Sequence, residues 1–146
     1  MKRIDFIVSL IKGFDIVLDI GTDHGLVLKK ALDLKYIKKG IASDNKIEPL
    51  ERAKKKLKRY PVDFYLSDGF EKIFDSNFDL VLICGMGPYT ISKILSKYSF
   101  QNKYFLLGCQ GKVHYLIEWL KLNNFFVLKY YNFYHKFNYL FLKVFK

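Results

Sequence analysis

The sequence predicts an α/β fold, with a mostly parallel sheet, helices on both faces and an antiparallel hairpin that closes the sheet. Short apolar runs alternate with amphipathic helical patterns for five rounds. Two long β-rich runs then follow one another with only a polar turn between them. At 146 residues the chain is long enough for a hydrophobic core, so we expect a single domain over residues 1–146.

The chain begins with MKRIDFIVSLIKGFD, which predicts an amphipathic helix with Ile4, Ile7, Val8 and Ile11 on one face. Its two early positive charges are also found in secretory signals, but its apolar stretch is only about five residues long and lacks a small-residue cleavage site. No run approaches the ~20 apolar residues of a membrane span. We therefore expect a cytoplasmic protein without a membrane partner.

The central stretch is DIVLDIGTDHGLVL, from Asp15 to Leu28. A short apolar run ends at Asp19, a turn with Gly21 and Gly25 follows, and then a helical pattern begins. This order is typical of nucleotide-binding α/β domains, because glycine lets a ligand approach the backbone and the helix start offers unpaired N–H groups. The turn lacks G-x-G-x-x-G and G-K-[ST], the patterns of dinucleotide and P-loop sites. An acid followed by glycine suits a ligand with a cationic amine and a ribose, such as S-adenosylmethionine (SAM).

The other elements are predicted from periodicity and turn residues. We expect helices over residues 26–34, 47–59 and 113–122, strands over 41–43, 62–66, 78–84 and 104–107, and hairpin strands over 125–133 and 139–145. A further helix after Pro88 should face inward through Ile91, Ile94 and Leu95. The run over 78–84 is almost continuously apolar, which is typical of a central strand buried on both faces.

Acidic residues and glycines follow several predicted strands. They are Asp19, Asp44, Asp68 and the pair Gly85 and Gly87. A single aspartate is a common turn residue or helix cap. However, the carboxyl ends of parallel strands meet at one edge of a sheet, so this set predicts one ligand site there. The acid at position 44, one strand–helix–strand unit after Asp19, suits the hydroxyl groups of a ribose.

The formal net charge is +11, most of it from lysine, which favours a polyanionic partner such as nucleic acid. The densest basic run lies on the predicted helix 47–59 and consists of Lys54, Lys55, Lys56, Lys58 and Arg59. This run is either a nucleic-acid surface or an ordinary solvated helix face. Cys84 and Cys109 have neither zinc-site nor disulfide-framework spacing, so we expect buried reduced thiols and no metal.

The turn DIGTDHG, the strand end at Asp44 and the segments SDGFEKI, FDLVLICGMG and IEWL resemble, in this order and spacing, bacterial tRNA (adenine-22, N1)-methyltransferases. The resemblance covers nearly the whole chain, from about Asp15 to Tyr139. It implies a Rossmann-like class I methyltransferase with a seven-stranded sheet, SAM as the cofactor, and tRNA as the partner that is methylated on N1 of adenine 22.

The resemblance also implies which residues form the site. Asp19 and Gly21 would flank the methionine part of SAM, Asp44 would bind the ribose hydroxyls, and Asp68 with Gly69 would meet the cofactor adenine. The full cofactor set is Asp19, Gly21, Thr22, Asp44, Asn45, Asp68, Gly69, Gly85, Met86 and Gly87, and the catalytic candidates are Asp23, His24 and Gln110. Asp23, His24 and the Gly85–Gly87 turn would face the methyl group and the target base.

The chain departs from the family pattern at a few positions. Pro88 stands where a second glycine is usual, Gly108-Cys109-Gln110 replaces a Gln-Pro-Asn-like segment, and Gly25 replaces an alanine. Relatives carry a C-terminal helical extension that this sequence does not show. We therefore expect lysines of the domain itself to hold tRNA.

Neutral adenine N1 has an in-plane lone pair and needs no strong base, so orientation should provide most of the acceleration. Asp23 could stabilise the cationic product ring, or it could be an N-cap; His24 could position the base or shuttle a proton, or it could be an exposed first-turn residue. Alternative functions are SAM-dependent methylation of another RNA or of DNA adenine, and a non-catalytic RNA- or SAM-binding relative. The missing Asn/Asp-Pro-Pro-Tyr turn and dinucleotide fingerprint disfavour a DNA N6-adenine enzyme and a reductase.

Overall fold

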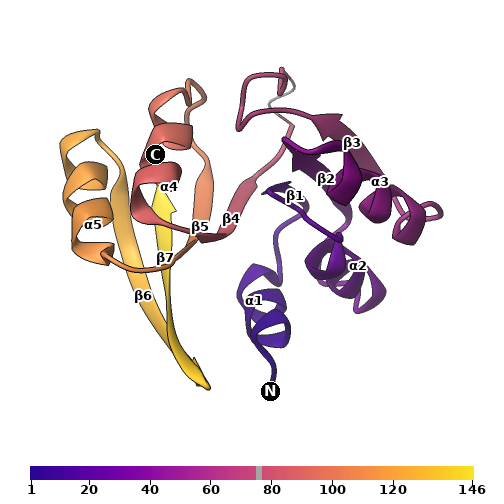
Figure 1. Cartoon of the computed structure of the whole chain (residues 1–146), viewed down its shortest axis with the longest axis horizontal. Helices are drawn as coiled ribbons and strands as arrows, with labels where there is room; N and C mark the ends of the chain where they lie inside the picture. The colour runs from indigo at the N-terminus through magenta and orange to yellow at the C-terminus, as the bar shows by residue number, and fades with distance from the viewer. Residues whose placement is uncertain (75–76) are drawn as a thin grey trace.

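The computed structural model describes residues 1–74 and 77–146, and its strands form a seven-stranded sheet of order β3-β2-β1-β4-β5-β7-β6 (Figure 1). The strands are β1 (Ile16–Ile20), β2 (Lys39–Asp44), β3 (Val62–Leu66), β4 (Leu80–Met86), β5 (Tyr104–Cys109), β6 (Phe126–His135) and β7 (Phe137–Phe145). Strands β1 to β5 pair in parallel, whereas β7 is antiparallel to both β5 and β6. The predicted mostly parallel sheet with a terminal hairpin is confirmed.

Parallel pairing brings the carboxyl ends of the strands to one edge of the sheet, which we call the rim. Ile20 at the end of β1 pairs with Ser43 on β2 and with Ile83 on β4. Asp44 at the end of β2 pairs with Leu66 at the end of β3. The strand order reverses between β1 and β4, and such a switch point is where open α/β sheets bind ligands.

Helices cover both faces of the sheet (Figure 1). They are α1 (Arg3–Ile11), α2 (Leu26–Asp33), α3 (Ile47–Lys56), α4 (Pro88–Ser96) and α5 (Val113–Leu122). On one face, Ile11 of α1 and Leu28 of α2 pack with Val17 of β1. On the other, Ile91 of α4 and Leu116 of α5 pack with the fully buried Phe105 of β5. Each helix buries its apolar stripe, which is why segments with helical apolar periodicity alternate with strand segments along the chain.

The N-terminal segment forms the predicted amphipathic helix. Ile7, Val8 and Ile11 are buried, whereas Ile4 is only partly buried. No helix in the described part of the chain is long and apolar enough to cross a membrane. The two cysteines form no disulfide; Cys109 is buried and Cys84 is partly buried.

The hairpin turns at Lys136, whose φ of 65° lies in the left-handed region. The polar turn between the two β-rich runs was therefore predicted correctly. Strand β7 returns between β5 and β6, and the backbones of Lys103 and Lys146 exchange hydrogen bonds of 2.9 and 3.1 Å at its far end. The ring of Phe133 on β6 stacks on Phe6 of α1 at 4.8 Å between centroids, so the hairpin also contacts the first helix.

Several predicted boundaries were wrong. Strand β2 begins at Lys39 rather than at position 41, and β5 ends at Cys109 rather than at 107. The hairpin strands cover Phe126–His135 and Phe137–Phe145 rather than 125–133 and 139–145. Helix α3 ends at Lys56 rather than at position 59, because the chain must turn after the fully buried Leu57 to enter β3. Strand β4 begins at Leu80 rather than at position 78. Phe78 is nevertheless buried, and it packs against the ring of Phe100, so its apolar character reflects core packing outside the strand.

Candidate active site

Two adjoining cavities open at the rim and share Gly21, Asn45 and Met86 in their walls. The first, of about 240 Å³, is also lined by Ile20, Ser67, Asp68, Gly69, Phe70, Thr90, Lys93, Ile94 and Lys97. The second, of about 530 Å³, is lined among others by Asp19, Thr22, Asp23, His24, Asp44, Cys84, Gly85 and Gln110. The predicted site residues therefore gather at one place, and Gly87, which lines neither cavity, lies beside Gln110.

Asp44 organises the turns on both sides of it. Its carboxylate is 7 % exposed and accepts the backbone N–H of Asp23 on Oδ2 at 3.1 Å and that of Lys46 on Oδ1 at 3.0 Å. Each oxygen keeps a second lone pair, so the group can still accept hydrogen bonds from a ligand hydroxyl. Asp44 is thus both a candidate ligand acceptor and a structural support, and the second role is not visible in the sequence.

The turn after β1 is held by β2 and by glycine. The backbone N–H groups of Gly21 and Thr22 both donate to the carbonyl of Ser43 at 2.9 Å. Gly21 has a φ of 75°, and a Cβ atom there would lie 2.6 Å from Cε of Met86. A side chain at this position would therefore be strained and would enter the junction of the two cavities.

Asp19 lies at the bottom of the second cavity with 5 % of its surface exposed. Burial of the carboxyl group, with smaller contributions from the nearby Asp44 and Asp23 carboxylates, raises its pKa to about 7. An acid with this environment gains from a neighbouring positive charge, because the charge would stabilise its ionised form. The bottom of this cavity is therefore suited to a cation.

Asp23 and His24 lie at the mouth of the second cavity. Asp23 has a φ of 55°, and its Oδ1 lies 3.5 Å from Nε2 of His24. The N-cap residue of α2 is Gly25, and no side chain caps that end. The N-cap alternative for Asp23 is therefore wrong. His24 also precedes the helix rather than lying in its first turn, and it lines the cavity with its side chain partly exposed.

Asp68 and Gly69 line the first cavity beyond the end of β3. The loop is held by the buried Ser67, whose hydroxyl donates to the Gly69 carbonyl and accepts the Lys72 N–H, both at 2.9 Å. Gly69 has a φ of 57°, and a Cβ atom there would lie 3.2 Å from Ile94 of α4. Because Gly69 has no side chain, a ligand in the first cavity can approach the backbone of this loop closely.

The end of β4 and Gln110 form the wall opposite α2. The β4–β5 register shifts between Cys84 and Met86, which leaves Gly85 at a φ of 81°. The backbone N–H of Gln110 donates to the Met86 carbonyl at 2.9 Å. Gln110 is exposed, so its amide side chain is available to a ligand in the second cavity.

The sequence did not reveal several cavity residues. Lys93 of α4 and Lys97, which directly follows that helix, line the first cavity, and Arg3 of α1 lines the second. The i, i+4 spacing of the two lysines indicates a shared face, but only the tertiary structure shows which one. Within the described residues, no group of three or more His, Cys, Asp or Glu side chains could hold a metal ion.

The basic run lies away from the rim. Helix α3 starts beside the rim and its ten residues carry the chain about 15 Å along the sheet, so the run at its end lies near the opposite edge. All five basic residues, Lys54, Lys55, Lys56, Lys58 and Arg59, are exposed. Nζ of Lys54 pairs with Glu51 at 3.3 Å.

The sheet order, the switch point and the rim cavities define a Rossmann-like α/β protein with a nucleotide-type site. A family model described as a methyltransferase domain matches residues 1–139. The chain therefore belongs to the methyltransferase-domain family.

The "Putative tRNA methyltransferase" of Mycoplasma pneumoniae is 32 % identical over 108 residues, which cover 72 % of this chain and 51 % of that protein. The chain thus spans about half the length of this curated relative. Two solved structures share the fold. The Mycoplasma capricolum TrmK structure with S-adenosyl-homocysteine matches with a TM-score of 0.88 and 24 % identity, over 99 % of this chain and 67 % of that one. The Bacillus subtilis m1A22 tRNA methyltransferase TrmK matches with a TM-score of 0.90 and 21 % identity, over 98 % and 64 %.

Proposed function

We propose that this chain transfers a methyl group from SAM to N1 of adenine 22 in tRNA. The observation that carries the proposal is the pair of adjoining rim cavities in a member of the methyltransferase-domain family, with the acids and glycines of the tRNA-methyltransferase pattern in their walls. The names of the similar proteins support the substrate. The proposal includes the expected single domain and cytoplasmic location.

The polar groups that line the two cavities fit SAM. The buried Asp19, whose ionised form gains from a nearby cation, suits the positively charged methionine end. Asp44, with its free lone pairs, and the adjacent Asn45 suit the ribose hydroxyls. Asp68 and Gly69, beside Phe70 and Ile94, suit the adenine. Taken together, the adjoining cavities of about 240 and 530 Å³ are within the ~300–1,000 Å³ of small-molecule sites.

SAM supplies an electrophilic methyl group on a positively charged sulfur. The protein has to hold an unpaired adenine with its N1 lone pair in line with that group, and we assign this task to the Gly85–Gly87 turn, His24 and Gln110. Since N1 lies on the Watson–Crick edge, the base must leave its stack to enter the second cavity. Asp23, at the cavity mouth, would stabilise the positive charge that develops on the ring.

Affinity for SAM should depend on pH through Asp19. With a pKa of about 7 in the free protein, the carboxyl is mostly protonated at pH 6 and mostly ionised at pH 8. Because SAM favours the ionised form, its affinity should rise about tenfold between these pH values. Calorimetry in buffers of different ionisation enthalpy should also detect proton release on binding at pH 6.5. A flat profile, or the same rise in Asp19→Asn, contradicts the role of this carboxylate.

The proposed activity is tested by methylation of defined tRNA transcripts with labelled SAM, followed by mapping of the modified base. We expect incorporation that disappears when adenine 22 is replaced by guanine. Incorporation that persists would indicate another target in RNA. Binding of SAM and tRNA without turnover would indicate a non-catalytic relative, and absence of SAM binding would remove the methyltransferase proposal.

The basic run at the end of α3 is proposed as a secondary tRNA contact. If Lys55, Lys56 and Lys58 contact phosphates, replacing all three with glutamine should reduce the slope of log affinity against log salt by about 2 to 3. Fluorescence anisotropy with labelled tRNA measures this slope. A slope equal to that of the wild type assigns the run to a solvated helix face.

A further inference from the structure

Arg3 lies where the first helix meets the rim. Its guanidinium is 5.3 Å from the centre of the Tyr139 ring on β7, and its Nη1 lies close to Gly85. Arg3 lines the large cavity that contains Asp23 and His24, and also a small one between Gly85, Gln110 and Tyr139. The side chain therefore reaches from α1 to the place where we put the target base.

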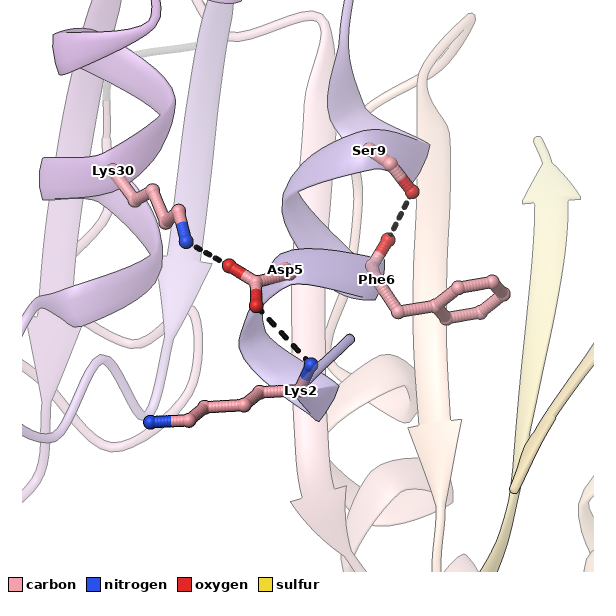
Figure 2. Close-up of polar contacts among 5 residues, drawn as sticks. All are labelled: Lys2, Asp5, Phe6, Ser9 and Lys30. Atoms are coloured by element: carbon pink, nitrogen blue, oxygen red, sulfur yellow. Dashed lines mark hydrogen bonds and ion pairs between the residues drawn. The ribbon is translucent and has the colours of Figure 1, made fainter. Parts of the chain in front are cut away.

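The first turn of α1 is held in position from two sides. Asp5 accepts the backbone N–H of Lys2 at 3.1 Å and pairs with Nζ of Lys30 on α2 (Figure 2). On the other side, the Phe6 ring packs against Phe133 and Phe141 of the hairpin. These contacts place Arg3 between α2 and the hairpin before any ligand binds, which limits the entropy lost when it binds one.

The charge of Arg3 is not neutralised by the protein. Within residues 1–74 and 77–146, no carboxylate oxygen lies within ion-pair distance of its guanidinium. A planar guanidinium that lies over the face of an aromatic ring keeps its edge donors available, and their geometry matches the oxygens of a phosphate. This arrangement is suited to an anionic group at the cavity mouth.

The hairpin extends the same wall outward. Strand β5 ends at Cys109 opposite Leu140, so the pairs from Phe133–Tyr139 to His135–Phe137 continue past the rim without a β5 neighbour. In Figure 1 the hairpin tip and the start of α1 both lie at the lower side of the molecule. A further cavity of about 530 Å³ lies here, lined by Gln110 and by Phe137, whose surface is 68 % exposed.

We infer that the RNA strand carrying the target adenine crosses the rim over the junction of α1 and the hairpin, with a backbone phosphate on Arg3 and an unpaired neighbouring base stacked on Phe137. This inference rests on the proposed tRNA methylation. Gln110 lines both the large cavity and the hairpin cavity, so the two cavities adjoin at this residue. Arginine for phosphate and an exposed aromatic ring for a base are the groups by which proteins hold single strands.

The Arg3 contact is tested with Arg3→Gln, Arg3→Lys and the control Lys121→Gln, which removes a charge at the far end of α5. For Arg3→Gln we expect KM for the tRNA transcript to rise about tenfold and the salt slope of tRNA affinity to fall by about 1, with the Kd for SAM within about twofold of the wild type. Arg3→Lys should restore the slope but only part of the affinity, since lysine lacks the planar fork. Lys121→Gln should match the wild type.

The stacking contact is tested with Phe137→Ala, Phe137→Tyr and the control Phe126→Ala, an aromatic ring with similar exposure at the opposite end of the hairpin. Phe137→Ala should weaken tRNA binding about fivefold or more, Phe137→Tyr should retain it, and Phe126→Ala should have no effect. Both positions are exposed, so folding is not expected to change.

The results separate the inference from the proposed function. If the wild type methylates adenine 22 while Arg3→Gln keeps its KM and salt slope, the inference is overturned and the proposed function remains. If the wild type binds the transcript without methylating it, the proposed methyltransferase activity is contradicted. The anisotropy measurements of tRNA binding still decide the roles of Arg3 and Phe137. A wild type that binds no tRNA overturns both.

Discussion

Asp44→Ala should weaken SAM binding by about 5- to 150-fold, which corresponds to about 1–3 kcal/mol. The change removes the proposed acceptor of the ribose hydroxyls. It also removes the oxygens that accept the backbone N–H groups of Asp23 and Lys46, so the turns on both sides of the cavity lose their common support. Calorimetric titration with SAM measures the loss.

Asp44→Asn separates the two roles of this residue. An amide keeps one acceptor oxygen, so the variant should retain one of the backbone contacts and show an intermediate affinity. Asp63→Ala is the matched control, since it removes an exposed carboxylate of β3, paired with Lys39, at a distance from the rim. Equal SAM affinity in Asp44→Ala and Asp63→Ala contradicts the proposed position of the cofactor.

Gly21→Ala should weaken SAM binding to a similar degree for a different reason. A methyl group at this position points at Cε of Met86 and into the junction between the two cavities. The Met86 side chain can move away from the added methyl group, but it then occupies space that the ligand needs. We expect this to weaken the free energy of SAM binding by about 1–3 kcal/mol. Gly21→Val, with a larger side chain, should abolish measurable binding at micromolar SAM.

Gly13→Ala is the control for backbone strain. Gly13 has a φ of 101°, and a Cβ atom there would have no neighbour within 4 Å. Both alanine variants should lose about 1–2 kcal/mol of stability in denaturant titrations, because both positions are left-handed. Only Gly21→Ala should lose affinity for SAM. If Gly13→Ala loses SAM affinity to the same degree, backbone strain rather than the cavity junction explains the loss.

The rim could be predicted because it depends on local patterns. A buried apolar run followed by Asp19, Asp44 or the Gly85–Gly87 turn marks a strand end, and parallel topology then requires these ends to meet. The same reasoning correctly gave β3, α5 and the hairpin turn. These features are fixed by periodicity and turn chemistry within about ten residues of sequence.

What the sequence did not reveal depends on contacts between distant segments. The importance of Arg3 comes from its contact with Tyr139, which is far away in the sequence, and its charge near the chain start indicated nothing of this. The support that Asp44 gives to the turns also depends on β1 and β2 lying side by side. Helix α3 ends before position 59 because Leu57 is buried in the core. Helix propensity alone does not predict this tertiary contact.

The position of β7 has a consequence for biosynthesis. It follows β6 in the chain but lies between β5 and β6, so these two strands cannot complete their pairing until residues 137–145 have emerged from the ribosome. Until then, two aromatic-rich edges with unpaired backbone groups are exposed in the nascent polypeptide. Translation that pauses within β7 would therefore leave these edges open to pairing with other chains.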